Sequence, residues 1–206
     1  MFFDWPSVAK GGKERMFFDW SLKSRYILNE WIVSRLNGLI QQVTEKLDKY
    51  DVTGAARAIE SFVVDDLSLW YIRRSRKHFE EVSGILAFAL STLSKLTAPF
   101  IPFLSEEIYR SATPVNFAKE SVHLEDWPKP DKKSINNQLE KDMEKVRAIV
   151  ASALAERAKA GIKVRQPLSL LKIRSTKSLP RRQAGEILND KGLLELIKEE
   201  ANVKEI

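Results

Sequence analysis

The 206-residue sequence contains no cysteine and only two histidines, His78 and His123. The absence of cysteine excludes disulfides, thiolate zinc sites and cysteine nucleophiles. The histidines form no HExxH or HxxxH pattern, and no glycine-rich phosphate-binding loop is present. The acidic pairs Asp65-Asp66 and Glu106-Glu107 are adjacent residues, which diverge by about 100° on a helix and do not converge on one substrate. We therefore expect no catalytic residue, no metal site and no enzyme activity in this chain by itself.

Long hydrophobic runs are also missing. No stretch approaches the ~18–20 apolar residues that a membrane-spanning helix needs. Asp4, Pro6 and Lys10 interrupt the aromatic N-terminus, which is not typical of a signal peptide. Hydrophobic residues make up 44% of the chain and charged residues 30%, which is the composition of a folded domain. We expect a soluble, cytoplasmic protein without a membrane contact.

Positive charge is in excess and is concentrated in two places. The net charge is +6, but residues 141–182 contain twelve basic and only three acidic residues, a local charge of +9. A second cluster has no acidic residue between Trp70 and Phe79, and it consists of Arg73, Arg74, Arg76 and Lys77. Clustered charge of one sign indicates a polyanionic partner more strongly than the overall charge does.

Apolar residues recur at helical spacing through most of the chain, which predicts a mainly α fold. Asp51 or Thr53 is a candidate cap, Pro102 a candidate helix start, and Pro99 and Gly161 candidate stops. Residues 167–173 and 203–206 are short and partly alternating, which favours strands. The helices are expected at 27–47, 51–77, 85–98, 102–109, 135–160 and 193–200.

This pattern divides the chain into three predicted parts. Residues 1–20 carry a short repeat, Met1-Phe2-Phe3-Asp4-Trp5 and Met16-Phe17-Phe18-Asp19-Trp20, and we interpret them as a non-native or flexible N-terminal segment. Residues 21–134 are expected to form a helical bundle. Residues 135–206 are expected to form a long helix with a small α+β appendage. The predicted fold is thus a bundle of four to five helices with a small C-terminal α+β appendage.

The second predicted helix becomes basic at its end. On a helical wheel centred on Ile59, Trp70 lies on the apolar stripe, and so do Arg73 and Arg74. Guanidinium groups bind phosphate by paired hydrogen bonds, and an exposed ring stacks an unpaired base. A simpler explanation stands beside this one: cations in a last turn complement the helix dipole, Asp66 pairs with Arg73, and Trp70 is a core residue.

Several ordered motifs resemble those of class I aminoacyl-tRNA synthetases. Residues 29–37 (NEWIVSRLN) look like the start of the anticodon-binding bundle of the enzymes for branched aliphatic amino acids, and residues 98–107 (APFIPFLSEE) and 123–128 (HLEDWP) match later segments. Residues 65–76 (DDLSLWYIRRSR), 163–168 (KVRQPL) and 202–206 (NVKEI) are similar to isoleucyl-tRNA synthetases in particular. The matches cover about residues 26–206. The HIGH and KMSKS signatures and the editing domain of this family are absent.

The resemblance implies a module that holds the anticodon stem-loop of tRNA-Ile for a catalytic domain outside this chain. It implies ATP and magnesium as cofactors of the parent enzyme, none bound by this chain, and partners that are tRNA-Ile and the catalytic domain of the same synthetase, with the protein a monomer. The candidate tRNA-binding residues are Trp70, Arg73, Arg74, Arg76, Lys77, Arg157, Lys159, Lys163, Arg165 and Gln166. We expect Glu106 and Glu107 to serve packing or docking.

Two other functions remain open on the sequence. One is a helical interaction domain of synthetase ancestry that binds a protein, which internal pairing of the basic residues would favour. The other is the equivalent module of a valyl- or leucyl-tRNA synthetase, against which the 73–76 and 164–168 motifs argue. A module that docks onto a catalytic domain is also expected to expose an apolar patch.

Overall fold

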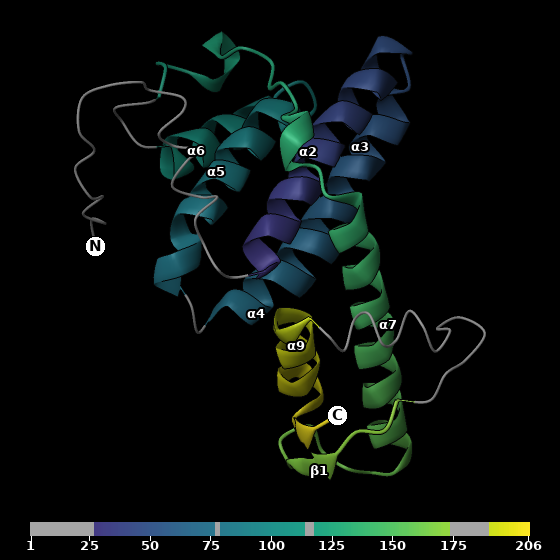
Figure 1. Cartoon of the computed structure of the whole chain (residues 1–206). Coiled ribbons are helices and arrows are strands. Elements are labelled where there is room, and N and C mark those ends of the chain that lie inside the picture. The colour runs from purple at the N-terminus through teal and green to yellow at the C-terminus, as the bar shows by residue number, and fades with distance from the viewer. Residues whose placement is uncertain (1–26, 77–78, 114–117, 174–189) are drawn as a thin grey trace. The chain divides into compact units, whose positions relative to one another are not determined.

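The computed structural model describes residues 27–76, 79–113, 118–173 and 190–206 (Figure 1). The expected N-terminal segment 1–20 and the candidate Lys77 lie outside these residues. The chain divides into two compact units, Met1–Ile135 and Asn136–Ile206. Each unit is described by itself below.

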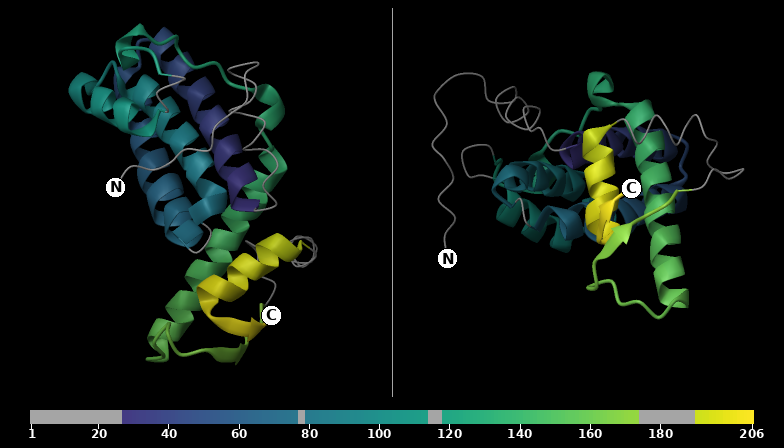
Figure 2. Two further views of the ribbon diagram at one scale, coloured as in Figure 1. Left: turned by 90° about the vertical axis from the view of Figure 1, so that its left-hand side faces the viewer. Right: turned by 60° about the horizontal axis from the view of Figure 1, so that its bottom comes forward.

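The first unit is a bundle of antiparallel helical hairpins (Figures 1 and 2). One hairpin pairs the first two helical stretches of the chain, and a second hairpin packs α5 against α6. This arrangement confirms the predicted mainly α fold. Within the described residues, no helix is both long enough and apolar enough to cross a membrane. The helices are α2 (Ile27–Asp48), α3 (Val52–Ser61), η1 (Phe62–Ile72), α4 (Arg73–Ser75), α5 (Phe79–Thr97) and α6 (Pro102–Ala112).

The core of the bundle forms where α2 meets η1 and α5. The apolar stripe of α2 is buried along its whole length, from Leu28 to Val43. Full burial of one such side chain contributes about 1.5–3 kcal/mol. A polar contact lies inside this core: the Tyr71 hydroxyl donates a hydrogen bond of 2.7 Å to Oδ1 of Asn29. A buried hydroxyl needs such a partner, so this bond fixes the register of η1 against α2.

The predicted helix over 51–77 forms as three consecutive segments, α3, η1 and α4. Asp51 is its cap, because the Asp51 carboxylate accepts a hydrogen bond of 2.8 Å from the Gly54 amide. The middle segment η1 is a π-helix, whose wider turn does not follow 100° per residue. A helical wheel drawn at 100° per residue therefore does not apply within η1, although Trp70, which it places on the apolar stripe, is buried.

The connection after α6 is held on the bundle by side chains of α2. It contains two short helices, η3 (Val122–Leu124) and η4 (Lys132–Ser134). The Trp127 indole donates a hydrogen bond of 2.9 Å to the Thr44 hydroxyl. Asn37, which is buried, accepts a hydrogen bond of 2.7 Å from the Asp131 amide. The long connection is therefore ordered by specific polar bonds despite its lack of periodicity.

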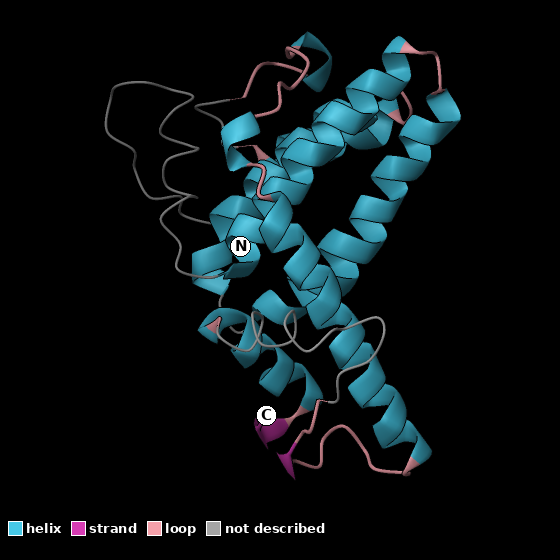
Figure 3. Ribbon diagram, turned by 45° about the vertical axis from the view of Figure 1, so that its right-hand side comes forward, coloured by secondary structure: helices cyan, strands magenta, loops and turns pink. Residues whose placement is uncertain are grey.

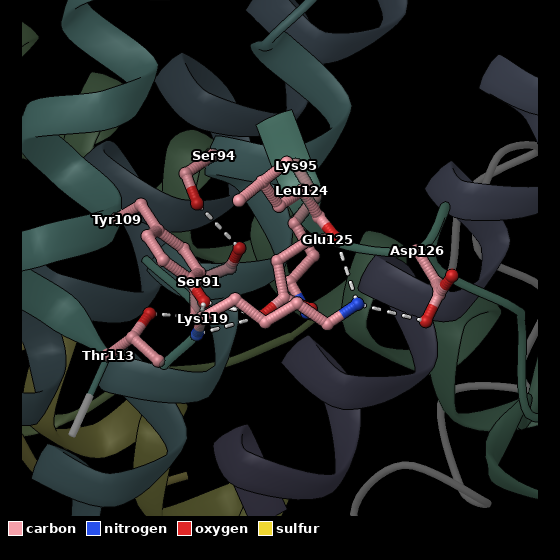
Figure 4. A network of polar contacts seen from close by, with 9 residues as sticks. All are labelled: Ser91, Ser94, Lys95, Tyr109, Thr113, Lys119, Leu124, Glu125 and Asp126. Carbon is pink, nitrogen blue, oxygen red and sulfur yellow. Dashed lines mark hydrogen bonds and ion pairs between the residues drawn. The ribbon is translucent and has the colours of Figure 1, made fainter. Parts of the chain in front are cut away.

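Glu125 is the centre of a polar network that ties this connection to α5 and α6 (Figure 4). The Tyr109 hydroxyl donates a short hydrogen bond to Glu125, and Lys95 Nζ lies 2.9 Å from the other carboxylate oxygen. The Tyr109 hydroxyl also accepts a hydrogen bond of 2.8 Å from the Lys119 amide. The Glu125 side chain is only 11% exposed, so the network places a largely buried carboxylate between two donors.

The network shifts the pKa values of Glu125 and Tyr109. Burial alone would raise the pKa of the Glu125 carboxyl group, but the hydrogen bonds from Tyr109 and Lys95 outweigh burial and lower that pKa below its usual 4.5. Burial and the bond to Glu125 raise the pKa of Tyr109 to about 12, so the hydroxyl keeps its proton for donation. Glu106 has a lowered pKa as well, because its carboxylate accepts hydrogen bonds from the Val122 amide and the Ser121 hydroxyl.

The described residues of the second unit form one long helix, one shorter helix and two short parallel strands (Figure 3). Leu168 pairs with Val203 and Leu170 pairs with Glu205. A small apolar cluster lies between these strands and the helices and contains Ala153, Ala201 and Val203. The helix and strand predictions after residue 135 are confirmed. The elements are α7 (Asn137–Lys159), β1 (Leu168–Leu170), α9 (Lys191–Ala201) and β2 (Val203–Glu205).

Replacement of Glu125 tests the polar network. Because its folded-state pKa is lowered, the carboxylate stabilises the fold above its unfolded pKa, and this contribution is lost as the pH falls through the lower folded value. Glu125→Gln is expected to lower the free energy of unfolding at pH 7 by about 1–3 kcal/mol and to weaken the loss of stability below pH 4.5. Urea unfolding across a pH series measures both effects.

Asp126→Asn is the matched control, since its side chain is 96% exposed and its Lys119 partner lies at 3.3 Å. It is expected to change the free energy of unfolding by no more than about 0.5 kcal/mol. Equal effects of the two substitutions would contradict the network.

Candidate nucleic-acid interface

The first cationic surface lies at the end of η1 and in α4. Arg73 and Arg76 are exposed there, and Arg74 is half-buried. Within the described residues, neither Arg73 nor Arg76 has an ion-pair partner. Both side chains are exposed, as a contact with phosphate oxygens requires.

Trp70 is a core residue, the simpler of the two interpretations of the sequence, and not an exposed stacking platform. Its side chain belongs to the core and is 7% exposed. The Arg74 guanidinium lies over the ring, 3.2 Å from the ring centroid, and its Nη1 donates to the carbonyl oxygens of Leu69 and Trp70 at 2.9 and 3.2 Å. Such a cation–π contact is worth about 0.5–2 kcal/mol. The guanidinium group of Arg74 covers the Trp70 ring, so a base cannot stack on that ring.

Asp66 connects this segment to α2. Its carboxylate accepts a hydrogen bond from Arg35 Nε at 2.9 Å, and the Asp66 side chain is almost fully buried. Asp66 thus pairs with Arg35 and not with Arg73, the partner that the sequence suggests. The partner lies 31 residues away, which sequence spacing along one helix does not reveal.

The second cationic surface is the loop 160–167 that follows α7. Gly161 has φ +68°, a value that a residue without a side chain adopts at no steric cost. The Gly161 amide donates to the Ala158 carbonyl and the Ile162 amide donates to the Arg157 carbonyl, a pattern that ends a helix and reverses the chain. The prediction of a helix stop at Gly161 is confirmed. Lys163, Arg165 and Gln166 are all exposed on this loop.

Arg157 does not offer its guanidinium to the surface, contrary to the sequence-based expectation. It is 5% exposed. Its Nη1 donates to the Ala201 carbonyl at 3.1 Å, and its Nη2 donates to the carbonyls of Lys163, Val164 and Gln166. The sequence does contain a clue to this arrangement, because an arginine in the last helical turn is placed to bind the carbonyls that follow. A direct phosphate contact by Arg157 is excluded in this conformation.

Lys159 is exposed and forms a surface ion pair with Glu156 at 2.7 Å, where both side chains are 73% exposed. The hydrogen bond to Glu156 raises the pKa of Lys159. Exposed pairs of this kind are weak, so the ion pair leaves Lys159 able to exchange partners. Four further basic residues of the 141–182 segment, Arg174, Lys177, Arg181 and Arg182, lie outside the described residues.

A pair of alanine substitutions separates the buried from the exposed members of the first surface. Trp70→Ala removes a buried ring and is expected to lower the free energy of unfolding by about 3–5 kcal/mol. Arg73→Ala removes an exposed side chain and is expected to change it by no more than about 0.5 kcal/mol. Urea unfolding followed by far-UV circular dichroism measures both. A Trp70→Ala protein as stable as the wild type would contradict the buried position of the ring.

Comparison with known proteins agrees with the motifs. The anticodon-binding domain of tRNA ligases matches residues 29–173. The chain is 41% identical over 192 residues to an isoleucine–tRNA ligase of Thermus thermophilus and 42% identical over 195 residues to one of Clostridium novyi. An isoleucine–tRNA ligase of Pyrococcus furiosus is 36% identical over 187 residues.

These matches cover 86–89% of the chain but only 17–18% of each relative, so the chain spans less than a fifth of the length of these ligases. The resemblance to isoleucyl-tRNA synthetases drawn from the motifs is confirmed by these relatives. The chain belongs to the family of anticodon-binding domains of tRNA ligases.

Proposed function

We propose that this chain binds the anticodon stem-loop of tRNA-Ile and positions the tRNA for aminoacylation by a catalytic domain outside the chain. The observation that carries the proposal is the match of residues 29–173 to anticodon-binding domains, together with exposed cations on both units. These cations are Arg73, Arg76, Lys159, Lys163 and Arg165.

The exposed arginines and lysines supply the affinity in this proposal. A cation that neutralises a phosphate releases a bound counterion, so the binding constant falls as the salt concentration rises. Arg73, Arg76 and Arg165 present planar forks that match phosphate oxygens, whereas Lys163 acts as a compact charge. Each of the two surfaces is therefore suited to contact an RNA backbone.

In this proposal, groups other than Trp70 recognise the bases. Guanidinium planes stack unpaired bases as aromatic rings do, so exposed Arg73 and Arg76 take the place of the buried ring. The exposed amide of Gln166 both donates and accepts hydrogen bonds, which suits it to a base edge. Arg74 is not one of these base-reading groups, because its guanidinium group covers the Trp70 ring.

The remaining steps belong to the parent enzyme in this proposal. The relatives are named isoleucine–tRNA ligases, and ATP with magnesium would act in their catalytic domain. The start of α6 exposes apolar side chains, with Phe103 92% exposed and Ile101 and Leu104 also exposed. Such a patch supports docking of this unit onto another part of a synthetase. The module is expected to work as a monomer.

A titration with RNA tests the proposal. The full chain is mixed with a tRNA-Ile transcript and with the same tRNA carrying a swapped anticodon, at two salt concentrations. Tighter binding to the native anticodon and a weaker affinity at high salt are expected. Arg73→Ala and Arg76→Ala are each expected to weaken binding and to reduce the salt slope by about 1.

The control is Lys49→Ala, an exposed cation at the opposite end of the α2–α3 hairpin, and it is expected to leave the affinity unchanged. Equal binding to both anticodons would mean a non-specific polyanion surface. Absence of binding at low salt would contradict the proposal and favour a helical domain that binds a protein.

A further inference from the structure

We propose that Arg157 is a positioning residue that holds the loop 162–167 in the shape that presents Lys163 and Arg165 to RNA phosphates. The residue itself does not contact the RNA. This inference rests on the proposed function, because it assigns a cause to the shape of one of the two RNA-binding surfaces.

The evidence is the set of acceptors that one guanidinium group reaches. Nη2 donates to Lys163 O at 2.8 Å, to Val164 O at 3.3 Å and, by a short bond, to Gln166 O. Nη1 donates to Ala201 O at 3.1 Å, at the end of α9. A single side chain therefore ties the last turn of α7 to the following loop and to the end of α9.

Only an arginine provides this arrangement. Its planar fork carries donors on two terminal nitrogens that point to different sides, whereas a lysine places its three donors on one atom. Burial of a cation without hydrogen-bond partners is strongly unfavourable, so Arg157 needs these carbonyl oxygens as acceptors. The carbonyl groups of the loop in turn need Arg157 as their donor. Asn202 supports the same loop, because its side-chain amide donates to Val164 O at 2.8 Å.

The exposure of Lys163 and Arg165 follows from the orientation of the carbonyl groups in this loop. The carbonyl oxygens of Lys163, Val164 and Gln166 turn inward to Arg157, and the side chains of 163–166 are exposed. Lys163 and Arg165 are thus held outward two residues apart, without an acidic partner among the described residues. A loop that is ordered before RNA arrives loses less conformational entropy on binding.

Arg157→Lys tests the inference, because it keeps the charge and removes the fork. In the full chain it is expected to speed amide hydrogen exchange within 162–167 and to weaken binding of the tRNA-Ile transcript. The expected weakening approaches that of the Lys163→Ala/Arg165→Ala double variant, whose salt slope falls by about 2. Arg165→Lys is the matched control: the same change at an exposed site is expected to leave loop exchange unchanged.

A combined variant distinguishes positioning from contact. When Lys163, Arg165 and Gln166 are all already alanine, Arg157→Lys is expected to weaken RNA binding no further. An additional loss of affinity in that background would overturn the inference, and so would weaker binding without faster exchange in 162–167. Unchanged affinity and unchanged exchange in Arg157→Lys would overturn it too.

Failure of the proposed function gives a different result. If the wild-type chain binds no RNA, or if the double variant binds as well as the wild type, the RNA-binding role of this loop is wrong. Faster loop exchange in Arg157→Lys would then still show that Arg157 orders the loop. The affinity and exchange measurements therefore report separately on the two claims.

Discussion

Both cationic surfaces depend on an arginine whose guanidinium group binds main-chain carbonyl oxygens. Arg74 donates to the carbonyls of Leu69 and Trp70 near the end of the first surface. Arg157 donates to the carbonyls of the loop after α7. A carbonyl oxygen can accept two hydrogen bonds, so Arg74 binds the Trp70 carbonyl although the Arg73 amide already donates to it. The arginines that bind the main chain and those that face solvent therefore have different tasks.

This division explains how a small module exposes dense positive charge on an ordered backbone. Exposed cations repel one another and do not order a loop by themselves. In each surface an arginine that binds the main chain, half-buried Arg74 or buried Arg157, lies next to the exposed cations. These exposed cations are Arg73 and Arg76 in the first surface and Lys163 and Arg165 in the second, and their backbone positions are thereby defined. The main chain of η1 is fixed in a similar way. Its residues Asp66 and Tyr71 bind Arg35 and Asn29 of α2, and these two polar bonds hold η1 against α2.

Sequence reasoning succeeded where the information is local. The Asp51 cap, the Pro102 helix start and the Gly161 stop follow from chemistry within a few residues, and all three form as predicted. The family followed from ordered motifs, which the relatives confirm.

It failed where the answer depends on burial. For Trp70 the sequence leaves a core position and an exposed position open, and for Arg157 it favours exposure because that residue lies in a basic segment. Neither the π-helical turn of η1 nor the carbonyl at Ala201 can be found from spacing along a helix. The charge pattern predicts both surfaces from the sequence, but it does not separate the residues that support them from those that face solvent.

Hydrogen exchange of the full chain with and without the isolated anticodon stem-loop of tRNA-Ile tests the central claim most directly. The account predicts slower amide exchange around Arg73 and Arg76 and in the loop 162–167 when the RNA is bound. It predicts no change at the tip of the α2–α3 hairpin around Lys49. Protection confined to other segments, or none while RNA is bound, would contradict the assignment of these two surfaces.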